Sequence, residues 1–184
     1  GYHYHVIQPD GKIIVTGGNI KRFNSDGSID NTFTPGTGTN AMINSAVLQS
    51  DGKIIIGGDF TNYNGISITK MARLNSDGLL DTSFNAGTAT NNGTPAFYDT
   101  GIFSIAVQAS GKIIVTGNFT SFNGVTNYFI TRLNPNGSID TDFNQISGGS
   151  NSVINTVALQ SDGKPIIGGS FTQYNGIGRN RIAR

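Results

Sequence analysis

One unit recurs four times along the chain, and this repetition restricts the protein to folds made of stacked, similar modules. Each copy has an apolar residue followed by glutamine, a turn that ends in Gly-Lys, and a short apolar run. The copies span residues 7–14, 48–55, 107–114 and 159–166. A second unit, in which a glycine turn follows arginine, spans residues 22–27, 73–78 and 132–137, and an aspartate and a phenylalanine follow each copy. Modules of this kind bury their apolar faces against neighbouring copies.

Each repeat contains short runs rich in isoleucine, valine, phenylalanine and threonine, separated by Asp-Gly or Asn-Gly turns. Such runs predict β-strands joined by tight hairpins, and no stretch shows helical periodicity with caps. In the second copy the strands are expected to end at Gln49 and to span 53–60, 68–75 and 79–84. Four short antiparallel strands per repeat are typical of a β-propeller blade.

The sequence therefore predicts an all-β, partial β-propeller with about three and a half four-stranded antiparallel blades. Three whole blades are expected at residues 1–34, 42–85 and 101–144, and a partial fourth at residues 152–184. The first copy is about ten residues shorter than the next two between its two glycine turns. We expect its middle hairpin to be blunter.

The runs 48–60, 63–65, 72–78 and 81–84 resemble the delta-60 repeat, a β-propeller family of bacterial, mostly exported proteins. The resemblance covers essentially the whole chain. It implies the propeller fold and a bacterial protein that is secreted or displayed at the cell surface. It implies no particular chemistry.

Composition narrows the partners that the chain can recognise. The 12 basic and 11 acidic residues leave a net charge of +1, which gives no electrostatic reason to expect binding to nucleic acid or to an anionic membrane. The absence of cysteine excludes disulfides and thiolate metal sites, and the apolar runs are too short to span a bilayer. We expect a protein or glycan partner. Further propeller blades, from the same or another chain, are expected to cover the exposed ends.

Hairpin alternation predicts two different faces. The turns 50–52 and 76–78 should lie on one face, where all copies are similar. The loop 62–65 and the inter-blade loop 85–101 should lie on the other, where lengths and residues vary. Variable loops are where binding usually resides.

The candidate binding residues lie on this variable-loop face. An aromatic residue followed by asparagine recurs in three copies, and the longest inter-blade loop adds two more aromatic and two more polar residues. These side chains suit contact with a sugar or a protein, and those from blades two and three could line one cleft. The alternative is that the aromatics pack and Asn-Gly makes the turn. The candidates are Tyr63, Asn64, Asn92, Phe97, Tyr98, Asp99, Phe122, Asn123, Tyr174 and Asn175.

Three other patterns have a structural and a functional interpretation. Residues 24–30 resemble part of a calcium loop, but a hairpin turn is favoured because the first and last ligands are missing. His3 and His5 share a strand face, but no other histidine is present to complete a metal site. The repeated arginines could form a binding ring or, as we expect, ion pairs across the hairpin. The pairs are Arg22 with Asp30, Arg73 with Asp81 and Arg132 with Asp140.

Glycine pairs at 17–18, 57–58 and 168–169, with Gly117 alone in the third copy, predict a bulge or a close backbone approach at one register of the second strand. No copy breaks the repeat pattern with an extra acid, base or nucleophile, so we expect no enzyme activity, no cofactor and no metal. The sequence thus favours a non-catalytic binding or scaffold module of an exported bacterial surface protein. The alternatives are part of an enzyme whose active residues lie in blades outside this chain, and a purely structural spacer.

Overall fold

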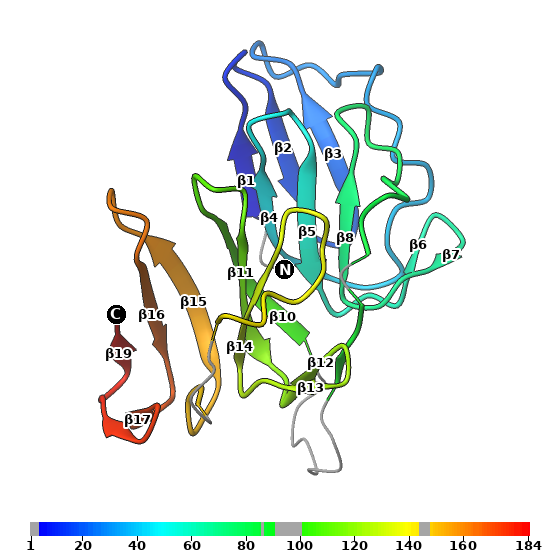
Figure 1. Cartoon of the computed structure of the whole chain (residues 1–184). Coiled ribbons are helices and arrows are strands. Elements are labelled where there is room, and N and C mark those ends of the chain that lie inside the picture. The colour runs from blue at the N-terminus through cyan, green and yellow to red at the C-terminus, as the bar shows by residue number, and fades with distance from the viewer. Residues whose placement is uncertain (1–3, 86, 91–100, 144–147) are drawn as a thin grey trace. The chain divides into compact units, whose positions relative to one another are not determined.

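The computed structural model describes residues 4–85, 87–90, 101–143 and 148–184. The regular secondary structure in these ranges consists of β-strands (Figure 1). The chain divides into two compact units, Gly1–Phe84 and Asn85–Arg184. The first unit contains blades one and two, and the second contains blade three and the partial blade four. No helix in the described ranges is long and apolar enough to cross a membrane.

Each blade has a three-stranded antiparallel sheet, whose strands we call A, B and C in chain order. Blade one contains β1 (Tyr4–Ile7), β2 (Ile13–Thr16) and β3 (Ile20–Phe23). Blade two contains β4 (Ile43–Leu48), β5 (Ile54–Gly58) and β8 (Met71–Leu74). Blade three contains β10 (Gly101–Val107), β11 (Ile113–Asn118) and β14 (Ile130–Leu133). Blade four contains β15 (Ile154–Leu159), β16 (Pro165–Gly169) and β19 (Ile182–Ala183).

The expected fourth strand, D, is reduced to one bridge in each whole blade. These bridges join Phe23 to Ile29, Leu74 to Leu80, and Leu133 to Ile139. The strand ends early because the next residue is an aspartate whose side chain accepts a hydrogen bond from the backbone two residues later. In blade two, Asp81 Oδ1 accepts from Ser83 N at 3.0 Å, which bends the chain away from strand C.

A small second hairpin follows strand B in the later blades. It consists of β6 (Asn62–Tyr63) with β7 (Ile66–Ser67), β12 (Ser121–Phe122) with β13 (Val125–Thr126), and β17 (Gln173–Tyr174) with β18 (Ile177–Gly178). In the second unit β9 (Ala89–Thr90) also pairs with β12. In blade one β2 pairs with β3 up to Thr16 and Ile20, so the predicted blunter hairpin is confirmed.

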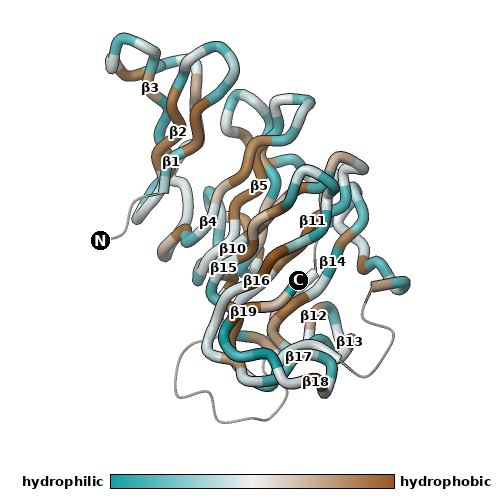
Figure 2. Tube along the Cα trace, turned by 90° about the vertical axis from the view of Figure 1, so that its left-hand side faces the viewer, coloured by the Kyte–Doolittle hydropathy of each residue, from teal (hydrophilic) through white to brown (hydrophobic). Residues whose placement is uncertain are grey.

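The core of each unit forms where adjacent blades bury apolar faces. In the first unit Ile14 and Ile20 of blade one pack with Ile54 and Ile56 of blade two, and all four are fully buried. The second unit has a similar cluster, which contains Ile114, Ile130, Ile154 and Ile167. Apolar residues therefore concentrate in the strands and polar residues in the turns (Figure 2).

The glycines of strand B permit close backbone approach, as predicted, but their register differs from the expectation. In strand B, Thr16 pairs with Ile20 of strand C, and Gly57 pairs with Met71 at the same register. The next residue of strand B is Gly17 in blade one and Gly58 in blade two. Gly17, not Gly18, is therefore the counterpart of Gly58. A Cβ at Gly58 would overlap the carbonyl oxygen of Met42 at a bulge between Ile43 and Ser45. Gly117 and Gly169 meet the backbone of strand A in the same way.

Candidate functional site

The repeated arginines form ion pairs inside each blade, as the sequence predicted. In blade one, Arg22 Nε lies 2.8 Å from Asp30 Oδ2, and Lys12 Nζ lies 2.8 Å from the same oxygen. The guanidinium also lies over the Phe33 ring at 4.9 Å and donates to Ser76 O of blade two at 2.6 Å. Hydrogen bonds from Lys12 and Thr32, with one from Arg22, lower the pKa of the Asp30 carboxyl well below its ordinary value. The arginines therefore stabilise the blades and are not a free binding ring.

The same cluster recurs in blades two and three. Its members there are Lys53, Arg73, Asp81 and Phe84, then Lys112, Arg132, Asp140 and Phe143. Sequence reasoning missed the lysine because the A–B turn that carries it is far from the aspartate along the chain. Its fixed place after each turn glycine was the available signal. In blade four, Lys164 instead pairs with Asp162 of its own turn at 2.8 Å.

Residues 24–30, which resemble part of a calcium loop in sequence, form a hairpin turn. Asp26 Oδ1 accepts hydrogen bonds from the Ser28 backbone at 2.9 Å and from the Ser28 hydroxyl at 2.6 Å. In the part of the chain that the structure describes, no three metal-ligating side chains of histidine, cysteine, aspartate or glutamate gather together. His3 lies outside the described residues.

Two of the candidate binding aromatics lie in the core, which corrects the expectation that they line a cleft. Tyr63 is fully buried and donates a hydrogen bond to Gly78 O at 2.7 Å, and burial raises the pKa of its hydroxyl. Phe122 is also fully buried, with its ring 5.6 Å from that of Phe119 in an edge-to-face arrangement. Tyr174 is half-buried. The packing alternative therefore holds for Tyr63 and Phe122, because core burial leaves no surface for a ligand.

The candidate asparagines hold the B–C turns and the connection that precedes each blade. Asn64, Asn123 and Asn175 have left-handed backbone conformations, with φ of 51°, 49° and 49°. Asn64 Oδ1 accepts from Thr37 N at 3.1 Å, and Asn175 Oδ1 accepts from Gly149 N at 2.8 Å. These amides are used structurally. The remaining candidates, Asn92, Phe97, Tyr98 and Asp99, lie outside the described residues.

A polar hollow of about 160 Å³ lies among the loops of the second unit. Tyr128 at its edge is 44% exposed, and it replaces Thr69 of blade two and Asn180 of blade four at the same place in the repeat. Ser150 N donates to the Tyr128 carbonyl at 3.3 Å, which fixes the backbone there. The hollow is lined by Tyr128, Gly148, Gly149, Ser150, Asn151, Gln173 and Gly176. Sequence reasoning passed over Tyr128, although its departure from the repeat was visible.

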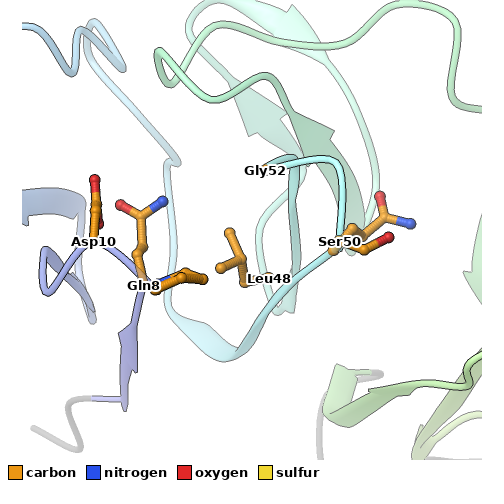
Figure 3. A pocket seen from close by; sticks show the side chains of 7 residues that line it. Gln8, Asp10, Leu48, Ser50 and Gly52 are labelled. Carbon is orange, nitrogen blue, oxygen red and sulfur yellow. The ribbon is translucent and has the colours of Figure 1, made fainter.

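A groove of about 390 Å³ lies in the first unit between the A–B turns of blades one and two (Figure 3). Gln8 and Asp10 come from the first turn, and Leu48 projects into the space between the turns (Figure 3). The lining residues are Gln8, Pro9, Asp10, Leu48, Gln49, Ser50 and Gly52. This groove lies on the face where the repeats are most alike, whereas the sequence drew attention to the variable loops.

Comparison with known proteins places the repeats in one family. The model described as a β-propeller domain of unknown function, DUF5122, matches residues 8–33, 49–84, 108–143 and 160–184. No curated protein matches the chain. A crystal structure of the extracellular domain of a B. thetaiotaomicron protein, described as a one-component system, is similar with a TM-score of 0.51 and 15% identity. The match covers 90% of this chain and 18% of that chain, and at this identity it shows a shared fold only.

Proposed function

Because the chain belongs to the DUF5122 β-propeller family, we propose that it is a non-catalytic binding or scaffold module that contacts a protein or glycan through its variable-loop face. The module is part of an exported bacterial surface protein. The resemblance of its sequence to the delta-60 repeat and the extracellular setting of the structurally similar B. thetaiotaomicron domain support that location. Further blades, from the same or another chain, cover its two outer blade faces.

The exposed Tyr128 beside the polar hollow is the observation that carries this proposal. An exposed tyrosine offers a flat apolar ring and a hydroxyl, and it sits where the other blades have a threonine or an asparagine. The exposed Gln173 also lines the hollow and adds an amide. An aromatic ring next to amide and backbone groups suits a sugar ring or a polar peptide segment.

The ion pairs within the repeat support a non-catalytic role. The aspartates with the most lowered pKa values, Asp30 and Asp81, each accept from a lysine and an arginine. A carboxylate held by two cations cannot act as a general base near neutral pH. These perturbed groups therefore have a structural explanation.

The test is a glycan array followed by binding measurements on the best ligand, with the 184-residue protein and its Tyr128→Ala variant. We expect the variant to lose at least about tenfold in affinity, as is usual for a central aromatic contact. Tyr4→Ala is the matched control, since Tyr4 is 46% exposed and belongs to the first unit.

Two results would count against the proposal. Equal affinity of the Tyr128→Ala variant for every ligand found would exclude the hollow as the contact site. An equal loss of affinity in Tyr4→Ala would show that exposed tyrosines bind the array ligands nonspecifically.

A further inference from the structure

The groove between the two A–B turns of the first unit has unsatisfied hydrogen-bonding groups in its walls. The Oε1 atoms of Gln8 and Gln49 are buried without a hydrogen-bond partner among the described residues. Neither side-chain amide forms a hydrogen bond to any other described residue. The same oxygen of Gln108 and Gln160 also lacks a partner, so the first unit is set apart by the Gln8 side-chain nitrogen, which does not make the bond that Gln108 Nε2 makes in the second unit.

At the equivalent place in the second unit, a hydrogen bond joins the two turns. There Gln108 Nε2 donates to Gly163 O in the A–B turn of blade four at 2.9 Å. The counterparts in the first unit are Gln8 and Gly52, and both line the open groove instead. The same repeat element therefore joins two turns in one unit and leaves a space between two turns in the other.

Acceptors and apolar surface dominate the groove. Leu48 and Pro9 supply apolar surface, and Asp10 supplies a carboxylate that has no ion-pair partner among the described residues. The lysines nearest to the groove in sequence already form ion pairs with other aspartates. Lys12 Nζ lies 2.8 Å from Asp30, and Lys53 Nζ lies 2.7 Å from Asp81.

We propose that this groove binds a lysine or arginine side chain presented by a partner protein. The aliphatic stem packs on Leu48 and Pro9, and the charged head pairs with the Asp10 carboxylate. A half-turn of the Gln8 amide turns its carbonyl oxygen toward the same cation, since Gln8 and Asp10 lie side by side in the first turn (Figure 3). That rotation breaks no hydrogen bond in the first unit, whereas it would break the bond to Gly163 in the second.

This proposal goes beyond the loop-face function and does not depend on it. The groove lies at the opposite end of the strands of blade two from the Asn64 turn, and none of its lining residues belongs to the Tyr128 hollow. One site can therefore fail its test while the other passes.

The test is a titration followed by two-dimensional ¹H–¹⁵N NMR, with pentylammonium chloride as the probe and neutral pentanol as its matched control at constant ionic strength. We expect saturable shifts at the amides of Asp10, Gly11, Gln49 and Gly52, with a dissociation constant in the millimolar range for so small a probe. Pentanol should bind at least about fivefold more weakly, because it cannot pair with Asp10.

Variants locate the binding. Asp10→Asn and Gln8→Leu should each weaken pentylammonium binding by about three- to tenfold with a native spectrum retained. Gln108→Leu should leave the affinity unchanged, because Gln108 lies in the second unit, where it bonds to Gly163 and does not line the groove. Shifts that fail to saturate, equal binding of pentanol, or an equal loss in Gln108→Leu would each overturn the proposal.

Discussion

The two ends of each blade are held together by different physics. The turn end, made of the A–B and C–D turns, is fixed by charged side chains: Lys53 and Arg73 meet Asp81 there in blade two. The loop end, made of the B–C hairpin and the incoming connection, is fixed by backbone contacts, such as Asn64 N donating to Gly38 O at 2.7 Å. The turn end should respond to pH, and the loop end should respond to added side-chain volume.

The largest effect should come from filling the close backbone approach at the loop end. A side chain at Gly58 overlaps the Met42 carbonyl, so Gly58→Val should lower the free energy of unfolding by about 3 kcal/mol. Chemical denaturation followed by circular dichroism measures this loss. Gly57→Thr is the control, because buried Thr16 and Thr116 occupy that register in other blades. Similar losses in both variants would contradict the register described above.

A smaller loss should follow removal of one charge at the turn end. Asp81→Asn leaves Arg73 almost buried without a carboxylate, and it should cost about 2 kcal/mol of unfolding free energy. The same denaturation experiment measures it. The exposed Asp162→Asn change in blade four is the control, and it should cost well under 1 kcal/mol. If the two changes cost the same, the shared aspartate is not what holds the turn end.

The pH dependence should separate the two ends further. The pKa values of Asp30 and Asp81 are lowered in the folded protein, so their contribution to stability is complete above the ordinary aspartate range. That contribution is lost as pH falls from about 4 through the lowered folded values. The cost of Asp81→Asn should therefore shrink between pH 5 and the acid limit of folding, whereas that of Gly58→Val should persist. A constant Asp81→Asn cost across this range would argue against an ionic role.

The smallest effect should come from the turn asparagines. Asn64 has φ of 51°, which alanine tolerates poorly, so Asn64→Ala should cost about 1 kcal/mol. Asn64→Gly keeps the backbone conformation and loses only the side-chain bond to Thr37. Comparing the thermal midpoints of both variants separates the two contributions. Equal losses in the two variants would show that the side-chain bond, which both remove, dominates over the backbone conformation.

Local pattern was enough to predict much of the fold. Asp-Gly and Asn-Gly turns located the hairpins, and the eight-residue separation of Arg73 from Asp81 predicted the ion pair. The length of strand D was overestimated because the side-chain hydrogen bond of Asp81 that ends it is invisible in an apolar pattern. At the candidate site the sequence could not predict burial, because the repeat pattern around Tyr63 is the same whether its ring packs in the core or contacts a ligand. The Gln8 groove could not be predicted, because it depends on the spacing between two turns 41 residues apart.

Lys12 and Arg22 share Asp30 and leave one positive charge, which the other charged residues of blade one offset, and this balance has a consequence for how such a protein can grow. Blade one contains three basic and three acidic residues, Lys12, Lys21, Arg22, Asp10, Asp26 and Asp30, and is therefore neutral as a block. A block that balances its own charge can be duplicated many times without building up electrostatic repulsion between copies. Gene duplication could then change the number of blades while leaving the isoelectric point and solubility of the chain nearly constant.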